Sequence, residues 1–305
     1  MAIQIISTVI EEKSANAPNA AATEAYSLCN WVDTGAKGNP PASWSVLWQP
    51  ADPTVPGYAV ILKGATANSY AVVIQGTKDK QDWTWDMDCQ TQVAFPFVAN
   101  ANISQGAANA LAGALSNTDD TGTTFASALK GISQPANSFL LTGHSLGGFL
   151  TSILAAWLSS QLTGNNTITA LASQISPITF APPAMADSNL ASFLNSQANY
   201  TAYFNTNDAI PYVWAMSGNF SVPNLYNLFP APGPSPMPQN FETQVAKNVT
   251  AMQNNNVSYQ QTNGITFTVA TVKPPIGNII ADQKWMWELT YEHNTAYYNY
   301  FLGGQ

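Results

Sequence analysis

The segment Gly143–Gly148 constrains the fold of this chain more than any other. It reads Gly-His-Ser-Leu-Gly-Gly, a G-x-S-x-G pattern with Ser145 at its centre. A short apolar run at 139–142 precedes it, and a helix-like run from 149 to 162 follows it. Strand, sharp turn and helix in this order hold a serine in a strained backbone conformation, with its hydroxyl group clear of the sheet. The two flanking glycines allow the strand and the helix to approach closely.

The chain offers few bases for such a serine, because His144 and His293 are its only histidines. A serine hydroxyl group is a poor nucleophile unless a neighbouring base accepts its proton. His144 is adjacent to Ser145 in the turn, so we expect its side chain to point elsewhere, as a packing or hydrogen-bonding residue. His293 alone could be a surface residue, but beside the serine pattern it is favoured as the base.

A carboxylate is needed to hold the imidazole in the correct tautomer. The candidates between the serine and His293 are Asp187, Asp208, Glu242, Asp282, Glu288 and Glu292. Asp208 follows an aromatic and β-branched run at 200–204, and the carboxyl ends of strands are where open α/β sheets place their ligand sites. Asp187 also follows a strand, but after more loop, and it could instead cap a helix that begins near Ser188. The order Ser, Asp, His is that of the α/β-hydrolases.

The remaining pattern predicts an α/β fold with a mostly parallel central sheet and helices on both faces. Strands are expected at 58–63, 69–74, 138–142, 177–180 and 200–204, and helices at 20–31, 105–115, 123–131, 147–162, 188–195 and 241–254. Asn263-Gly264 predicts a hairpin between strands at 257–260 and 265–269. A proline-rich run at 229–238 lies between Asp208 and His293, so we interpret it as a loop within a single domain spanning 1–305.

Composition excludes several classes of partner. Only 9% of residues are charged, the net charge is −8, and all nine basic residues are lysine, so we expect no binding to nucleic acid. No apolar run is long enough to span a bilayer. Residues 1–10 lack the features of a signal peptide, so either the protein is not exported by that route or a leader has been removed. Six N-x-S/T sequons leave an extracellular location open, and the compartment is not determined.

A second turn, Gln75-Gly76-Thr77, follows the predicted strand at 69–74. Acyl transfer requires donors directed at the oxygen that becomes negative, and a glycine at a strand end lets the backbone approach closely. We expect the backbone N–H groups of Thr77 and Leu146 to form this oxyanion hole, with the Thr77 hydroxyl group as a third donor. An ordinary β-turn is the alternative.

Cys29 and Cys89 are the only cysteines, and they are either a disulfide or two buried thiols. The pair Asp86 and Asp88 lacks further oxygen ligands at a metal-binding spacing, so we expect no metal and no cofactor.

These residues together resemble the class 3 lipases, the fungal-type triacylglycerol lipase family of α/β-hydrolases. The serine segment matches the family's G-H-S-L-G-G, and Ile74–Thr77 is similar to its oxyanion turn. The other similar segments are Thr179–Pro183 with Asn189–Phe193, Asn207–Pro211, and His293 with Tyr297. Trp83 also falls at the family's tryptophan spacing downstream of the oxyanion turn. The family's arginine before the oxyanion glycine is Gln75 here, and Ser104–Ala107 only partly matches its H-x-G-F element.

The resemblance implies a carboxylic-ester hydrolase acting on acylglycerols, with Ser145, Asp208 and His293 as the catalytic residues. It also implies a lid at 78–97, where Trp83, Trp85 and Met87 supply apolar surface and Asp79, Asp82, Asp86 and Asp88 supply charge. An acidic surface loop with aromatic anchors is the alternative to a lid. Residues 1–55 form an N-terminal extension packed on the domain, and 212–285 form an insertion that matches nothing in the family.

The partners expected are an ester or lipid substrate, encountered at a lipid–water interface, and the protein is expected to be a monomer. A phospholipase, a feruloyl-type esterase or an acyltransferase with the same three residues is the alternative within enzymes. A hydrolase fold that only binds lipid is the non-catalytic alternative.

Overall fold

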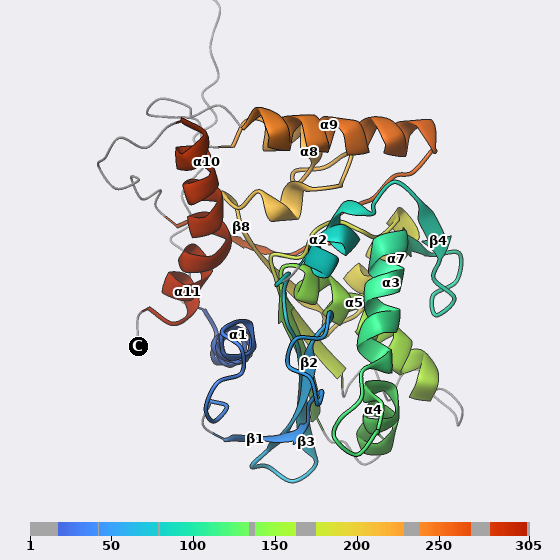
Figure 1. The fold of residues 1–305 in the computed structure, drawn as a ribbon, viewed down its shortest axis with the longest axis vertical. Coiled ribbons are helices and arrows are strands. Elements are labelled where there is room, and N and C mark those ends of the chain that lie inside the picture. Colours follow the sequence, from blue (N-terminus) through green and yellow to red (C-terminus); the bar gives the residue numbers. More distant parts are fainter. Residues whose placement is uncertain are drawn as a thin grey trace, which may run out of the picture.

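The computed structural model describes residues 18–41, 43–78, 80–133, 138–162, 175–228, 238–269 and 281–303. Its centre is a seven-stranded sheet in the order β1-β2-β3-β6-β7-β8-β9 (Figure 1). The strands are β1 (Trp44–Trp48), β2 (Ala59–Gly64), β3 (Ser69–Ile74), β6 (Ser138–His144), β7 (Ile175–Phe180), β8 (Thr201–Asn205) and β9 (Ile265–Phe267). The pairs β1–β2 and β2–β3 are antiparallel, and the other neighbours are parallel.

The register of the parallel strands brings distant segments to one edge. Ile74 at the end of β3 pairs with Gly143, and His144 at the end of β6 pairs with Phe180. Phe180 in turn pairs with Tyr203 of β8. The turns that follow β3, β6 and β8 therefore lie side by side at the carboxyl edge of the sheet, as the α/β pattern predicts.

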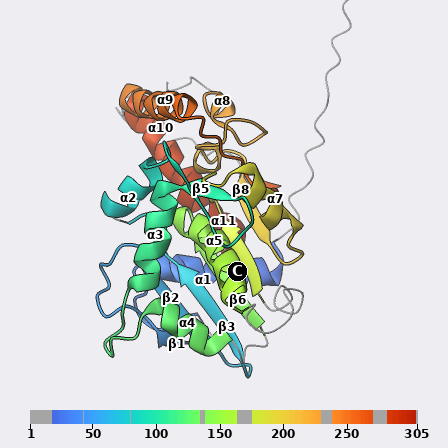
Figure 2. The same ribbon diagram turned by 90° about the vertical axis from the view of Figure 1, so that its right-hand side faces the viewer.

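Helices cover both faces of the sheet, as expected (Figure 2). One face carries α1 (Ala20–Asp33) and α11 (Ala296–Phe301), which pack against each other and around the buried side chains of Tyr26 and Phe180. The other face carries α3 (Gln105–Ser116), α4 (Phe125–Ser133) and α5 (Leu146–Leu162). Helix α7 (Ser188–Ser196) and the small hairpin of β4 (Gln92–Ala94) and β5 (Asn102–Ser104) extend this second layer.

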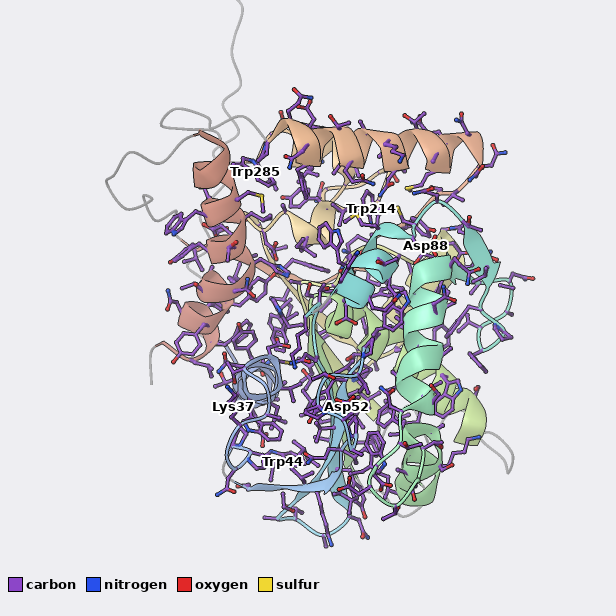
Figure 3. All side chains as sticks on the ribbon, viewed as in Figure 1. Lys37, Trp44, Asp52, Asp88, Trp214 and Trp285 are labelled. Atoms are coloured by element: carbon purple, nitrogen blue, oxygen red, sulfur yellow. The ribbon has the colours of Figure 1, made fainter. Side chains whose placement is uncertain are left out.

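The carboxyl edge of the sheet is covered by further helices. These are α2 (Lys80–Met87), α8 (Val222–Leu225), α9 (Gln239–Asn254) and α10 (Ala281–Thr290), and α10 continues through the π-helical turn Tyr291–Thr295 into α11 (Figure 1). Buried side chains, among them Trp214 and Trp285, fill the space below α9 (Figure 3). The expected insertion thus contributes α8, α9 and β9, while residues 229–237 and 270–280 lie outside the described residues.

The hairpin predicted at 257–260 and 265–269 is wrong. β9 pairs in parallel with β8, and Tyr259 forms only an isolated bridge to Ala215. Tyr259 is buried, and its hydroxyl group donates a hydrogen bond to the carbonyl oxygen of Cys89, 2.7 Å away. Tertiary contacts with β8 and with the Cys89 region therefore override the local turn signal of Asn263-Gly264.

Cys29 and Cys89 are two separate buried thiols, which decides between the two readings of the cysteines. The Cys29 sulfur lies 3.1 Å from the hydroxyl oxygen of Thr142 on β6. No helix within the described ranges is long and apolar enough to cross a membrane.

Candidate active site

Ser145 occupies the sharp turn between β6 and α5. Its φ angle is +59°, in the left-handed region, and its N–H group donates to the carbonyl oxygen of Phe180 at 2.9 Å. A side chain on Gly143 would collide with the carbonyl group of Gly147, and one on Gly147 would collide with that of Ile74. The two glycines are therefore required for the close crossing of strand and helix, as the sequence pattern indicated.

Asp208 and His293 meet at this edge, although 85 residues separate them in the sequence. The Nδ1 atom of His293 lies 2.8 Å from the Oδ2 atom of Asp208, which is fully buried. The other carboxylate oxygen of Asp208 accepts a hydrogen bond from the N–H group of Ile210 at 2.9 Å. A carboxylate can only accept a hydrogen bond, so the Nδ1 atom of His293 carries the proton and donates it. The Nε2 atom is then the ring nitrogen with a free lone pair.

The other carboxyl candidates lie elsewhere. Asp187 caps α7, because its Oδ1 atom accepts from the N–H group of Leu190 at 2.9 Å, and its Oδ2 atom accepts from Asn102. This is the capping role that the sequence left open for it. Glu242 lies in the first turn of α9, and the side chain of Asp282 is outside the described residues.

The sequence named Glu292, beside His293, only as a candidate for the catalytic carboxylate, and its structural role was not predicted. Glu292 is fully buried, and its Oε2 atom accepts a hydrogen bond from the side-chain amide of Asn205 at 2.7 Å. Its Oε1 atom has no partner among the described residues. Desolvation by burial raises the pKa of Glu292 to about 7. The same Asn205 donates its backbone N–H group to the hydroxyl oxygen of Tyr297 at 2.8 Å, so Asn205 ties β8 to the histidine segment at two points.

His144 is hydrogen-bonded to the backbone of His293, which is the kind of role that the sequence suggested for it. Its Nε2 atom lies 2.7 Å from the carbonyl oxygen of His293, and the two rings are 4.5 Å apart. Burial, with the neighbouring His293 imidazole, holds the pKa of His144 well below its usual value. A neutral ring that donates from Nε2 to a carbonyl oxygen leaves Nδ1 as an acceptor.

The turn after β3 presents one free backbone donor to the site. The N–H group of Gly76 donates to Asp33 at 2.9 Å, and that of Lys78 donates to Asp82 at 3.0 Å. Between them, the N–H group of Thr77 has no acceptor among the described residues. Leu146 is the first residue of α5, where helical N–H groups lack an acceptor within the helix.

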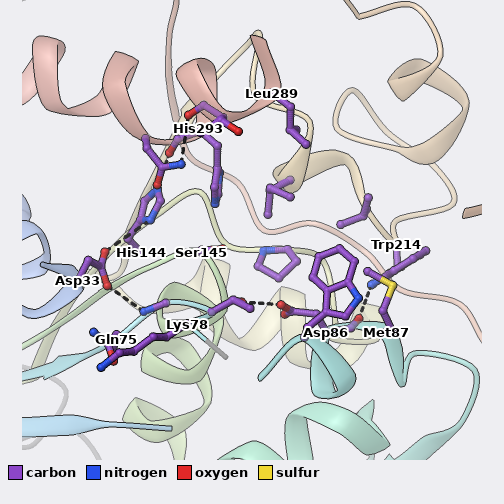
Figure 4. Close-up of a pocket in the computed structure, with 18 of the residues that line it drawn as sticks. Asp33, Gln75, Lys78, Asp86, Met87, His144, Ser145, Trp214, Leu289 and His293 are labelled. Carbon is purple, nitrogen blue, oxygen red and sulfur yellow. Dashed lines mark hydrogen bonds and ion pairs between the residues drawn. The ribbon is translucent and has the colours of Figure 1, made fainter. Parts of the chain in front are cut away.

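The hydroxyl group of Thr77 is already engaged. It donates to the Oδ2 atom of Asp86 on α2 at 2.5 Å, so it does not stand free as the third donor expected from the sequence (Figure 4). Desolvation by burial raises the pKa of Asp86 to about 7. The indole N–H group of Trp214 donates to the carbonyl oxygen of Asp86 at 2.9 Å, which fixes the end of α2.

Helix α2 falls within the candidate lid at 78–97, and its apolar residues divide between two surroundings. Trp83 is 47% exposed and, with Met87, lines the cavity above Ser145. Trp85 is only 9% exposed and packs against Gly106 and Gly113 of α3, so it belongs to the core and supplies no lid surface. Asp79 lies outside the described residues.

A cavity of about 430 Å³ brings these elements together. Ser145, His293 and Thr77 line it, with Asp33, His144 and Asp86 (Figure 4). A second cavity of about 510 Å³ adjoins it between α2, α9 and α10. The two cavities share the side chains of Trp83, Met87, Ile210, Phe241 and Leu289. The site thus combines a few polar groups with a long apolar wall, which is typical of ligand pockets.

Within the described ranges, no group of three or more His, Cys, Asp or Glu side chains could hold a metal ion. Asp86 faces Thr77 and Trp214 and does not form a ligand set with Asp88.

Comparisons with known proteins agree with this architecture. The sequence profile of the family described as lipase (class 3) matches residues 71–217. M37 lipase is similar in structure over 94% of this chain and 87% of its own, with a TM-score of 0.68 and 20% identity. Rhizomucor miehei triacylglyceride lipase is similar over 65% of this chain and 77% of its own, with a TM-score of 0.50 and 20% identity. No curated protein sequence matches the chain.

The structural likenesses confirm the α/β-hydrolase fold. The matched segment runs from β3 through the serine turn and beyond the turn that carries Asp208. Over residues 71–217 the chain is thus similar to the class 3 lipases, and this similarity supports a carboxylic-ester hydrolase.

Proposed function

We propose that this protein hydrolyses long-chain carboxylic esters, acylglycerols foremost, through an acyl-enzyme on Ser145. The observation that carries the proposal is that His293, paired with the buried Asp208, lines one largely apolar cavity together with the strained Ser145. This combination of a serine, a base and a carboxylate generates an activated nucleophile.

In the acylation step, the hydroxyl oxygen of Ser145 attacks the ester carbonyl carbon while the Nε2 atom of His293 takes the hydroxyl proton. Asp208 holds the proton on Nδ1 and stabilises the imidazolium ion that forms. The backbone N–H groups of Thr77 and Leu146 stabilise the developing oxyanion. His293 then returns its proton to the leaving alcohol, which departs from the acyl-enzyme.

Deacylation repeats these steps with water. His293 takes a proton from a water molecule as its oxygen attacks the acyl carbon, and the proton then returns to Ser145. The carboxylic acid is released and the free enzyme is restored.

The second cavity supports the choice of a long acyl chain. Its wall is largely apolar, and five shared residues make it continuous with the cavity above Ser145. Burial of each methylene group contributes roughly 0.8 kcal/mol, so a chain that reaches between α9 and α10 gains much more than a short one. The exposed side chains of Trp83 and Met286 lie at these cavities and suit contact with a lipid surface, with α2 as the lid.

The hydrolysis itself is tested with Ser145→Ala and a fluorophosphonate probe. Wild-type protein should hydrolyse p-nitrophenyl esters and take the label covalently, and the variant should lose several orders of magnitude in kcat while melting at the same temperature. An unlabelled wild-type protein, or a variant with comparable turnover, would contradict the proposal and favour a lipid-binding protein.

The acyl site is tested by filling the second cavity from α9. Gln244 lines this cavity but not the first, whereas Ala246 lies on the exposed side of the same helix. Gln244→Trp should lower kcat/KM for p-nitrophenyl palmitate at least tenfold and leave the butyrate ester within twofold. Ala246→Trp is the matched control and should change neither. Equal effects on both esters would argue against an acyl chain in this cavity.

A further inference from the structure

The C-terminal end of α1 is bound to the turn that follows β3. The Oδ1 atom of Asp33 accepts the Gly76 N–H group at 2.9 Å. The side-chain amide of Gln75 donates to the carbonyl oxygen of Val32 at 2.7 Å. Two consecutive residues of the helix end therefore hold two consecutive residues of the turn. This helix lies outside the segment at 71–217 that matches the family.

Asp33 also faces the serine turn. Its Oδ2 atom lies 3.7 Å from the Nδ1 atom of His144, too far for a hydrogen bond (Figure 4). Its side chain is 30% exposed and lines the cavity above Ser145. A Cβ atom on Gly76 would lie only 3.0 Å from the carbonyl oxygen of His144, the residue before Ser145. Asp33 thus contacts the turn directly beside the reacting group.

The position of this carboxylate is unfavourable for the helix alone. The C-terminal end of a helix carries a partial negative charge, so an acidic residue there opposes the helix dipole. The hydrogen bond to Gly76 is the contact that compensates, and it acts on the turn rather than on the helix.

We propose that Asp33 is a positioning residue for the oxyanion hole. By accepting the Gly76 N–H group, Asp33 fixes the peptide between Gln75 and Gly76. The next N–H group, that of Thr77, is then left without an acceptor of its own and stays directed at the cavity. Gln75 adds a second attachment at the place where the family's arginine would stand. The inference rests on the proposed ester hydrolysis, because it concerns the donor that stabilises its oxyanion.

The role requires an acceptor at residue 33 and not a charge. Asparagine keeps a carbonyl oxygen where Asp33 has Oδ1, so Asp33→Asn can still accept the Gly76 N–H group. Asp33→Ala removes the acceptor, and the side chain of Asp33→Ser is too short to replace it. Glu24 lies near the other end of α1, where it accepts a hydrogen bond from the indole N–H group of Trp44 at 2.9 Å. Glu24→Ala is therefore the matched control.

The experiment measures kcat and KM for p-nitrophenyl butyrate and the melting temperature of each variant. Loss of one oxyanion donor costs roughly a hundred- to a thousandfold in kcat, and a misplaced donor should cost less. We expect Asp33→Ala and Asp33→Ser each to lose about 10- to 100-fold in kcat, with KM within twofold. Asp33→Asn should recover most of this loss, to within about threefold of the wild-type kcat, and Glu24→Ala should match wild type.

Several outcomes would overturn the assignment. They are a kcat for Asp33→Ala and Asp33→Ser within threefold of wild type, an Asp33→Asn variant as impaired as Asp33→Ala, and losses that follow the melting temperature in all four variants. The fluorophosphonate probe separates this failure from that of the proposed function. If the wild-type protein is labelled at Ser145 but the Asp33 variants behave as just described, only the positioning role is wrong.

Discussion

Replacing the buried Glu292 by glutamine should stabilise the protein in alkaline solution but not in acid. Glu292 is fully buried, with one oxygen bound to Asn205 and the other without a partner among the described residues. Its pKa rises from 4.5 to about 7 on folding. Between these values the folded protein binds more protons than the unfolded chain, so the free energy of unfolding decreases as the pH rises.

The size of the effect follows from the shift. Each pKa unit corresponds to about 1.4 kcal/mol, so the rise at Glu292 sets an upper limit of roughly 3 kcal/mol lost by pH 8. Glu292→Gln cannot ionise and escapes this loss. The amide oxygen of the glutamine can still accept the hydrogen bond from Asn205. Its amide nitrogen takes the place of the Glu292 oxygen that has no partner among the described residues. We expect a gain of at most about 1 kcal/mol at pH 5 and a larger gain, about 1–3 kcal/mol, at pH 8.

Urea unfolding of both proteins at pH 5, 6, 7 and 8, followed by circular dichroism, measures the difference directly. Taking the difference cancels the shared contributions of Asp33 and Asp86, whose pKa values are also raised. If the two stabilities fell in parallel with pH, or if the variant were the less stable one at pH 8, Glu292 would not be a carboxyl group that folding keeps protonated.

Two further pairs of variants test the site and the serine turn. Asp208→Asn should reduce kcat by about 10⁴-fold, because His293 loses the correct tautomer, whereas Asp187→Asn should cost about 1 kcal/mol of stability as a lost helix cap and little activity. Steady-state kinetics and melting curves distinguish these from the reverse assignment. Gly147→Ala should prevent folding, since the added methyl group collides with the Ile74 carbonyl group, whereas Gly131→Ala in α4 meets no neighbour and should stabilise by about 0.5–1 kcal/mol. Soluble yield and thermal unfolding check this pair, and a well-folded Gly147→Ala would contradict it.

The sequence predicted the parts of the site whose signals are local. The serine turn is such a case, because the strand, the glycines around Ser145 and the following helix occupy one continuous stretch. Asp208 was placed beside His293 by the strand that precedes it together with the family pattern. The helix of residues 20–31 was also predicted, and it ends two residues later, at Asp33.

The missed features depend on pairs of residues that are distant in sequence. Asp33 and Gly76 are 43 residues apart, and Asn205 and Glu292 are 87 apart, and neither pair has a local signature. The predicted hairpin around Asn263-Gly264 failed for the same reason, since β9 finds its partner in β8. Trp85 is apolar and lies in the candidate lid segment, so the sequence suggested a lid residue. Only its packing against α3 shows that it belongs to the core.

The long contacts of the site also determine when it can form. The ring of His144 meets the carbonyl group of His293 across 149 residues, and Asp33 must reach the turn at Gly76 from a helix that precedes the whole sheet. Loops of this length close slowly, because their entropy is lost before any contact compensates for it. A nascent chain that has been translated only through α5 already contains Ser145 and His144, yet it lacks His293, the base proposed for the serine. In the proposed mechanism, the nucleophile can therefore be activated only after the His293 segment has docked, when almost the whole chain has been synthesised.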